Sequence, residues 1–220
     1  MNRTWIALFA AFTVTSVSAA LEQRSHPAFG AGSITVDSSS GLAWLTPRVT
    51  EGLSFLQVSA LLTNDLRFSG FRFATTSDLE GLFVAAAIPD INVPGYGAYY
   101  GTSANAQPAQ ALLNLVGATY RVTVAGTTVL SAAGHYGAPT LNPVNGFLSV
   151  PMAEVVLRTG VPTASGLQSF ASASTDWSSL TVGSAYPGVG SWLVTPVSEP
   201  AAPFLALAAL AVLWRLRRDA

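Results

Sequence analysis

The C-terminal tail most limits what this chain can fold into, because its pattern predicts a membrane segment that is not part of the folded domain. Ser198-Glu199-Pro200 precedes an apolar run from Ala201 to Trp214, and Arg215-Leu216-Arg217-Arg218 follows that run. A helix from Ala201 to Leu216 would rise roughly 24 Å, whereas a bilayer core is about 30 Å thick and usually takes about 20 apolar residues. The tail is therefore a marginal span. Its arginines would stay in the cytoplasm, so the part before Pro200 is expected outside.

Two uses of the tail stay open on physical grounds. Pro196 and Pro200 keep the chain before the helix extended, because proline lacks an N–H and restricts the residue before it. An extended strip beside a membrane helix is what a processing protease or a transpeptidase can grip. A plain anchor that is never cut is the alternative.

The tail also resembles a known sorting signal. Glu199-Pro200, a short apolar helix and the terminal cluster of Arg215, Arg217 and Arg218 resemble the PEP-CTERM signal of Gram-negative bacteria, with Ser198 where that family usually has a first proline. The resemblance implies an exosortase-like membrane transpeptidase as partner, an inner membrane-anchored precursor and cleavage near the motif. The mature protein would then be placed at the cell surface or outside the cell.

The N-terminus agrees with export. Met1-Asn2-Arg3-Thr4 is a short basic start, Trp5 to Val14 is apolar, and Val17-Ser18-Ala19-Ala20 offers small residues for cleavage. These are the three parts of a secretory signal peptide; a buried N-terminal helix is the alternative. The expected organisation is a signal peptide over 1–20, a loose leader over 21–32, one domain over 33–197 and the sorting tail over 198–220.

Charge and cysteine content exclude several classes of function. Between Leu21 and Val197 there are six arginines and nine acidic residues, and the whole chain has no cysteine. A net charge of about −3 argues against a nucleic-acid partner, which would need a basic face. Without cysteine there is no disulfide, no thiolate metal site and no cysteine nucleophile, so the stability of the exported domain must come from its core.

Capping patterns predict two helices. Ser54 and Gln57 form a capping box, and a second box uses either Thr75 with Asp78 or Ser77 with Glu80. Apolar residues then recur on one face of each helix. The expected buried positions are Phe55, Val58, Leu61 and Leu62 in the first helix, and Leu79, Leu82, Phe83 and Ala86 in the second.

The remaining elements are expected to be short. Strands are predicted around 33–37, 42–45, 70–74, 120–130, 153–158 and 191–195, with a short helix over 109–116. Loops are predicted over 89–108, 134–151 and 160–190. Helices among scattered strands indicate a compact α+β domain with long surface loops.

The middle of the chain resembles a second family. Gly41-Leu42-Ala43-Trp44-Leu45, then Gly70-Phe71-Arg72-Phe73-Ala74-Thr75, then Ser191-Trp192-Leu193-Val194 follow the order seen in the C-terminal domain of the collagen-like adhesin Lcl. Phe71, Ala74 and Asp78 depart from that family's usual Trp, Pro and Glu. The resemblance implies a C-type-lectin-like fold, in which two helices pack on antiparallel strands, and it implies no particular activity.

Three tyrosines form the candidate ligand surface. Tyr96, Tyr99 and Tyr100 lie in a glycine-rich segment, and tyrosine supplies rigid contact area with a polar tip. The alternative is that these side chains fold back onto the domain. Arg72 is expected to pair with an acid within the fold rather than with a ligand.

No catalytic residue, cofactor or metal site is expected. A lectin-type calcium site needs six to eight oxygen ligands, and neither Asn142-Pro143-Val144-Asn145 nor Asp176-Trp177-Ser178 supplies two clustered carboxylates. The histidines are His26, in the expected leader, and His135, which lies in Gly134-His135-Tyr136-Gly137 and is expected to be a solvated loop residue.

These observations lead to two hypotheses. The first is an exported, exosortase-processed protein without enzymatic activity, which acts at the cell surface or in the extracellular matrix by adhesion or by association with exopolysaccharide. The alternative is a secreted carbohydrate-binding module or glycan-active enzyme. The alternative predicts an aromatic platform, or paired carboxylates from Asp90, Glu154 or Asp176 in one cleft.

Overall fold

A computed structural model describes residues 21–91, 101–141 and 146–197, apart from the side chains of 176–179. The predicted signal peptide and sorting tail lie outside the described residues. So do Tyr96, Tyr99 and Tyr100, and the segment 142–145. Within the described residues, no helix has the length and apolar character needed to cross a membrane.

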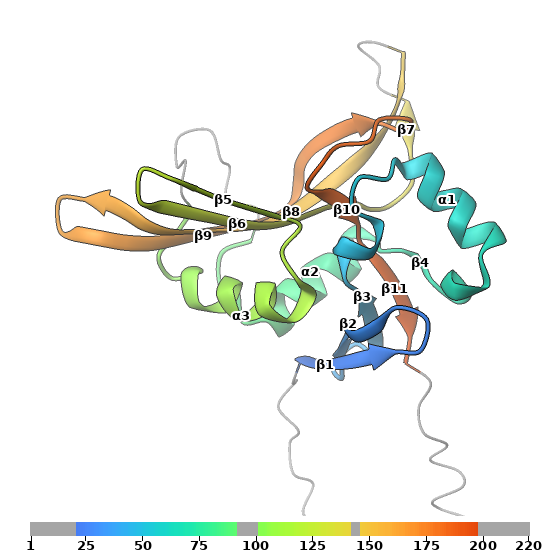
Figure 1. The fold of residues 1–220 in the computed structure, drawn as a ribbon, viewed down its shortest axis with the longest axis horizontal. Helices are drawn as coiled ribbons and strands as arrows, with labels where there is room; N and C mark the ends of the chain where they lie inside the picture. Colours follow the sequence, from blue (N-terminus) through green and yellow to red (C-terminus); the bar gives the residue numbers. More distant parts are fainter. Residues whose placement is uncertain (1–20, 92–100, 142–145, 198–220) are drawn as a thin grey trace, which may run out of the picture.

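The first sheet, sheet A, joins the start and the end of the described chain. Its strands are β1 (Leu21–His26), β2 (Gly30–Asp37), β3 (Leu42–Leu45), β4 (Arg72–Phe73) and β11 (Leu193–Pro196). They lie in the order β1-β2-β3-β11-β4, and every neighbouring pair is antiparallel. The closing strand therefore lies between β3 and β4, at the bottom of Figure 1.

The second sheet, sheet B, is larger and is built around a long hairpin. Its strands are β5 (Tyr120–Val124), β6 (Thr127–His135), β7 (Thr140–Leu141), β8 (Leu148–Thr163), β9 (Gly166–Thr181) and β10 (Val189–Ser191). β8 pairs with β9 on one side and with β6 and β7 on the other. The far edge of β6 is shared by β5, which is antiparallel to it, and β10, which is parallel.

Three α-helices and two 3₁₀ turns complete the described part of the fold. They are η1 (Pro47–Thr50), α1 (Phe55–Asn64), η2 (Leu66–Phe68), α2 (Thr76–Ala85) and α3 (Ala106–Val116). Both predicted capping boxes are present: Ser54 with Gln57 begins α1, and Thr75 with Asp78 begins α2. Thr75 with Asp78 is one of the two alternatives predicted for the second box, and it places Ser77 and Glu80 inside the helix rather than at its cap.

The main core lies between sheet B and the two helices α2 and α3, which cover one of its faces (Figure 1). Trp44 and Trp192 are almost completely buried in this core, and their rings meet edge to face with 6.3 Å between centroids. Trp192 lies between β10 of sheet B and β11 of sheet A, so one buried side chain connects the two sheets. A smaller cluster, which includes Val58 of α1 and Phe68, packs against sheet A.

The mixed α+β class and the mainly antiparallel pairing are confirmed. The short helix predicted over 109–116 is present as α3, so in the described residues three helices, rather than the two of the C-type-lectin-like layout, pack on the strands. Several local predictions were wrong. The expected leader contains β1, which pairs with β2, and the expected loop over 160–190 is largely occupied by the end of β8 and by β9, each strand being 16 residues long. The expected loop over 134–151 is interrupted by the end of β6, by β7 and by the start of β8. β9 buries Ala171, Ala173 and Thr175; such small side chains carry a weak hydrophobic signal, because strand preference depends on the surroundings.

Candidate functional site

A cavity of about 320 Å³ lies on sheet B, where β5 and β10 meet end to end along the edge of β6. Tyr120 of β5, Ser131 of β6, Glu154 and Arg158 of β8, and Gly188 before β10 contribute to its lining. Its volume is at the small end of the range for small-molecule sites, about 300–1,000 Å³. The residues come from four separate parts of the chain.

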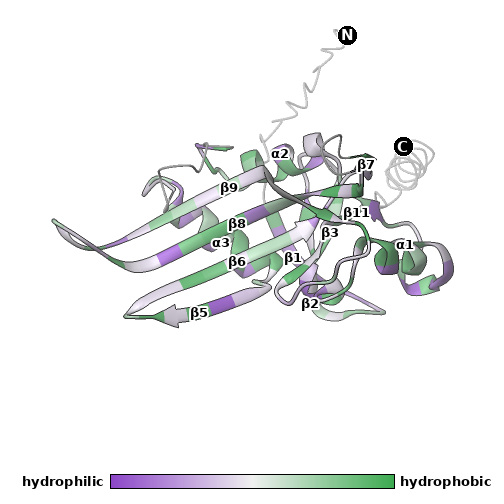
Figure 2. Cartoon of the chain, turned by 90° about the horizontal axis from the view of Figure 1, so that it is seen from above, coloured by the Kyte–Doolittle hydropathy of each residue, from purple (hydrophilic) through white to green (hydrophobic). Residues whose placement is uncertain are grey.

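The two-residue period of strands decides which side chains reach this cavity. Ala153, Val155 and Leu157 of β8 are buried in the main core, so Glu154 and Arg158 project from the opposite, outer face. Figure 2 looks onto that outer face: β5, β6, β8 and β9 spread toward the viewer, and α3 lies behind them. The cavity thus opens on the face of the sheet that α2 and α3 do not cover.

Thr119 and Gly188 fix Tyr120 at the rim. The Thr119 hydroxyl donates to the Gly188 carbonyl at 2.6 Å and accepts from the Ala133 N–H at 3.1 Å, which ties the segment before β10 to β6. Gly188 has φ +76°, and a Cβ there would lie 3.3 Å from Tyr120 Cβ and Cδ2. Glycine therefore allows both the turn and the close contact with Tyr120, whose side chain stays 48 % exposed.

Glu154 is the chemically distinctive residue of the cavity. Burial raises the pKa of its carboxyl to about 7, although the hydrogen bond from the Ser131 hydroxyl and the positive charge of Arg158 both act to lower it. The group therefore changes charge near neutral pH. Arg158 lies four residues further along the same face of β8, with Val156 between them.

His135 corrects the prediction of a solvated loop residue. It is the last residue of β6, its side chain is fully buried, and burial lowers its pKa to about 4. The flanking glycines mimic a turn in the sequence, but Gly134 lies within the strand, where a Cβ would come 3.1 Å from Trp192 Cδ1. Close packing, and not a turn, requires this glycine.

Ser191 lies beside His135, but the two side chains do not have the geometry of a catalytic nucleophile and its base. Ser191 of β10 pairs with His135 in register. Within the described part of the chain, neither the His135 ring nitrogens nor the Ser191 hydroxyl has a hydrogen-bond partner. Nucleophilic catalysis uses a base that accepts a hydrogen bond from the nucleophile, and no such bond joins Ser191 to His135 in the described structure.

Of the three acids proposed for a cleft, Asp90 and Glu154 do not converge. Asp90 accepts a hydrogen bond from the Thr102 hydroxyl at 3.0 Å, and its neighbour Ile91 bridges to Ala173 of β9, on the far edge of sheet B from the cavity. The side chain of Asp176 lies outside the described residues, so Glu154 alone is placed in the cavity. No group of three possible metal-ligating side chains occurs among the residues that the structure describes.

Arg72 pairs with an acid as predicted, since its guanidinium lies 2.7 Å from the Asp78 carboxylate. Tyr120, Ser131 and Arg158 were missed by sequence reasoning. A strand was predicted around 153–158, and within it Val155 and Leu157 alternate with Glu154 and Arg158. This alternation, which places Glu154 and Arg158 together on one face, was the available signal. Comparison with protein-family models, curated proteins and solved structures found no significant match for the chain.

Proposed function

We propose that this chain is an exported protein without catalytic activity that associates with extracellular polysaccharide through the outer face of sheet B. The signal-peptide pattern over 1–20 and the sorting pattern over 198–220 support the route. An exosortase-like transpeptidase acts on the inner membrane-anchored precursor, and the mature protein reaches the cell surface or the extracellular matrix of a Gram-negative bacterium.

The observation that carries the binding role is the side-chain chemistry of the cavity. Tyr120 offers a half-exposed ring, and Ser131, Glu154 and Arg158 offer a hydroxyl, a carboxyl and a guanidinium on the same face. Sugars present hydroxyl groups and apolar ring faces together, and these side chains match both properties. An open sheet face also allows a long polymer to pass across the site.

The C-type-lectin-like relationship belongs to the same proposal. The pairing of β3 with β11, which brings Leu45 opposite Leu193, supports it, as do the two capped helices between these strands. The proposal uses this relationship for the fold, and it includes no calcium site.

The route is tested with the full chain in a Gram-negative host that has an exosortase system. Mass spectrometry of the mature C-terminus is expected to find cleavage near Pro200, and deletion of 198–218 is expected to abolish outer localisation. Unchanged processing and export after the deletion would contradict the proposal.

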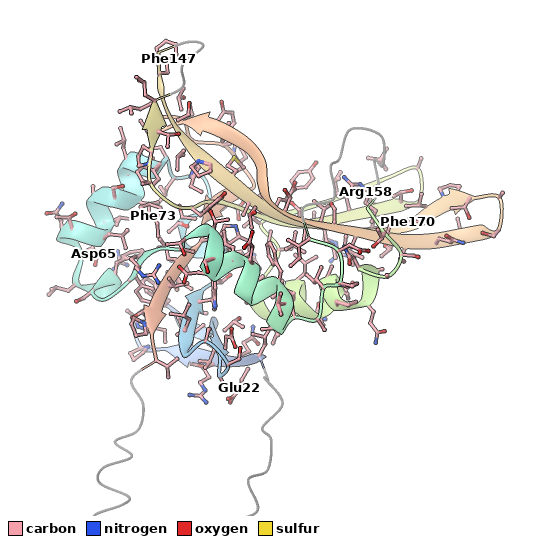
Figure 3. All side chains as sticks on the ribbon, turned by 180° about the vertical axis from the view of Figure 1, so that it is seen from behind. Glu22, Asp65, Phe73, Phe147, Arg158 and Phe170 are labelled. Atoms are coloured by element: carbon pink, nitrogen blue, oxygen red, sulfur yellow. The ribbon has the colours of Figure 1, made fainter. Side chains whose placement is uncertain are left out.

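Polysaccharide association is tested by affinity electrophoresis in gels that contain exopolysaccharide of the host. Tyr120→Ala is expected to weaken retardation by about tenfold in apparent Kd. Phe147→Ala is the matched control, because Phe147 is 62 % exposed and lies at the opposite end of sheet B from Arg158 (Figure 3). Equal effects of the two variants would argue against the cavity as the contact.

A glycan-active enzyme is the second candidate, and the raised pKa of Glu154 is the observation that favours it, because general acids of glycosidases have raised pKa values. If the wild type releases reducing ends from a polysaccharide and the Glu154→Gln variant does not, the protein is a glycan-active enzyme rather than a binding protein.

A further inference from the structure

We propose that one end of sheet A, the terminal row, rests on the phospholipid headgroups of the inner membrane in the precursor, where short links to the membrane segments hold it. The terminal row consists of Leu21 of β1, Asp37 of β2, Leu42 of β3 and Pro196 of β11, each in register with the next. This inference rests on the proposed route and adds which side of the domain meets the membrane.

Both ends of the described chain lie at the terminal row. Leu21 is the first residue of β1, and Pro196 is the last residue of β11. Because the strand order is β1-β2-β3-β11, three strand spacings of about 4.8 Å place these two residues about 14 Å apart. The expected signal peptide and the expected sorting tail therefore join the domain on the same side.

Packing and a hydrogen bond hold both of these ends in the fold. Leu21 packs against the main core, and Val197, which follows β11, packs against the smaller cluster of sheet A. The Val197 N–H also donates to the Gly41 carbonyl at 2.8 Å. The links to the membrane segments therefore begin directly at the terminal row.

The links themselves are short. Three residues, 198–200, separate Val197 from the apolar run that begins at Ala201, and six residues separate Leu21 from Val14, the end of the apolar part of the signal peptide. The chain from Val197 to Ala201 spans at most about 14 Å, and that from Val14 to Leu21 at most about 25 Å. Since the headgroup layer on each side of a bilayer is itself about 5–8 Å thick, an inserted tail brings the terminal row to the headgroups.

The charges at the terminal row are compatible with this contact. The exposed serines 38–40 form the turn between β2 and β3, and two of them donate their hydroxyls to the buried Asp37 carboxylate. The neighbouring Glu22 carboxylate pairs with Arg24 at 2.7 Å. Anionic headgroups repel a carboxylate that has no partner, and both of these carboxylates have one.

The outer face of sheet B lies on the opposite side of the molecule. In Figure 1, sheet B spans the upper part, α2 and α3 lie below it, and β1 and the end of β11 lie at the bottom; Figure 3 shows the same arrangement from behind. The face that these helices leave uncovered carries the cavity and therefore points away from the terminal row. A precursor that rests on the terminal row presents the cavity away from the membrane.

The test uses the whole precursor, made in a host without exosortase and inserted into vesicles of phosphatidylethanolamine and phosphatidylglycerol with a quencher on the headgroups. Because the chain has no cysteine, a single introduced cysteine carries a fluorophore at a chosen site. Ser38→Cys labels the exposed turn beside the terminal row, and Ala164→Cys is the matched control in the exposed turn between β8 and β9. Quenching is expected to be about threefold stronger at residue 38, because the short link keeps only that turn near the headgroups.

A longer link tests whether the short connection holds the terminal row in place. Insertion of about twelve Gly and Ser residues after Val197 makes this link long and flexible, and is expected to lower quenching at residue 38 to the level at residue 164. The same insertion after Ala164 is the matched control and is expected to leave quenching at residue 38 unchanged. Circular dichroism checks that each variant folds.

Flotation of the vesicles separates this inference from the route on which it rests. Equal quenching at residues 38 and 164 in a precursor that floats with the vesicles would overturn this inference alone. Quenching at residue 38 that stays high after insertion behind Val197 would do the same. A precursor that does not float with the vesicles has no inserted tail, which would overturn the proposed route together with this inference.

Discussion

A buried histidine makes stability depend on pH at the scale of a single residue. His135 has a pKa of about 4 in the folded chain and about 6.5 when unfolded. The unfolded state therefore binds a proton first as pH falls, and the folded state loses stability from pH 6.5 down to about pH 4, by up to about 3 kcal/mol. We expect His135→Leu to remove this loss, so its stability relative to wild type rises as pH falls. Urea denaturation of both proteins at several pH values measures this difference in stability.

The His135 effect has to be measured as the difference in unfolding free energy between the variant and the wild type, because Glu154 changes the stability of both with pH in the opposite direction. Its folded pKa of about 7 lies above the unfolded value, so its contribution to stability is lost as pH rises from about 4.5 to about 7. His26→Gln is the matched control, as the other histidine of the chain. If the unfolding free energies of wild type and His135→Leu change in parallel with pH, the His135 ring is not buried in solution.

At the scale of an element, Asp78 has two roles at the N-terminus of α2. Its carboxylate accepts from the Thr75 N–H at 2.7 Å, which completes the capping box, and it also pairs with Arg72. Burial alone would raise the pKa of Asp78, but hydrogen bonds from Arg72 and Thr75 lower it. We expect Asp78→Ala to cost about 1–2 kcal/mol of unfolding free energy, and Arg72→Gln below about 0.5 kcal/mol, since the Arg72 side chain is 48 % exposed.

Chemical denaturation of both variants separates the cap from the ion pair. If the Arg72→Gln variant is as unstable as Asp78→Ala, the ion pair and not the cap stabilises the start of α2. The stabilising contribution of Asp78 is present above its unfolded pKa and is lost as pH falls through the lower folded value. The cost of Asp78→Ala is therefore expected to shrink in acid.

Elements were predictable where their signals are local. The capping boxes at Ser54 and Thr75 lie within four residues each, and both helices begin where these patterns place them. β9 was missed and β8 was predicted only over 153–158, because the pairing of both strands is decided by distant partners: Val155 lies opposite Ala132 on one side and Ala173 on the other. The cavity depends on the same long-range pairing, so its residues could not be grouped from the sequence.

At the scale of the whole molecule, Trp192 lies where the chain passes directly from sheet B into sheet A. The chain leaves β10, passes through Trp192 and enters β11, so sheet B and sheet A share this residue. The Trp192 N–H donates to the His135 carbonyl at 2.9 Å, and its own carbonyl accepts from Ala74 before α2 at 2.8 Å. The predicted single closing strand over 191–195 is therefore two strands in different sheets, because the backbone turns from one to the other at Trp192.

Because Trp192 is shared, its truncation is expected to weaken both sheets. The Trp192 indole donates to the Ala153 carbonyl of β8 at 3.1 Å, whereas the Trp44 indole N–H has no partner among the described residues. Both Trp→Phe variants lose buried area, but only Trp192→Phe also loses a hydrogen bond, so it is expected to be less stable than Trp44→Phe by about 1 kcal/mol. Native-state hydrogen exchange is expected to show lower protection in β3 and β11 as well as in β6 and β8. Loss of protection in only one sheet would mean that the two sheets open independently, despite the shared residue.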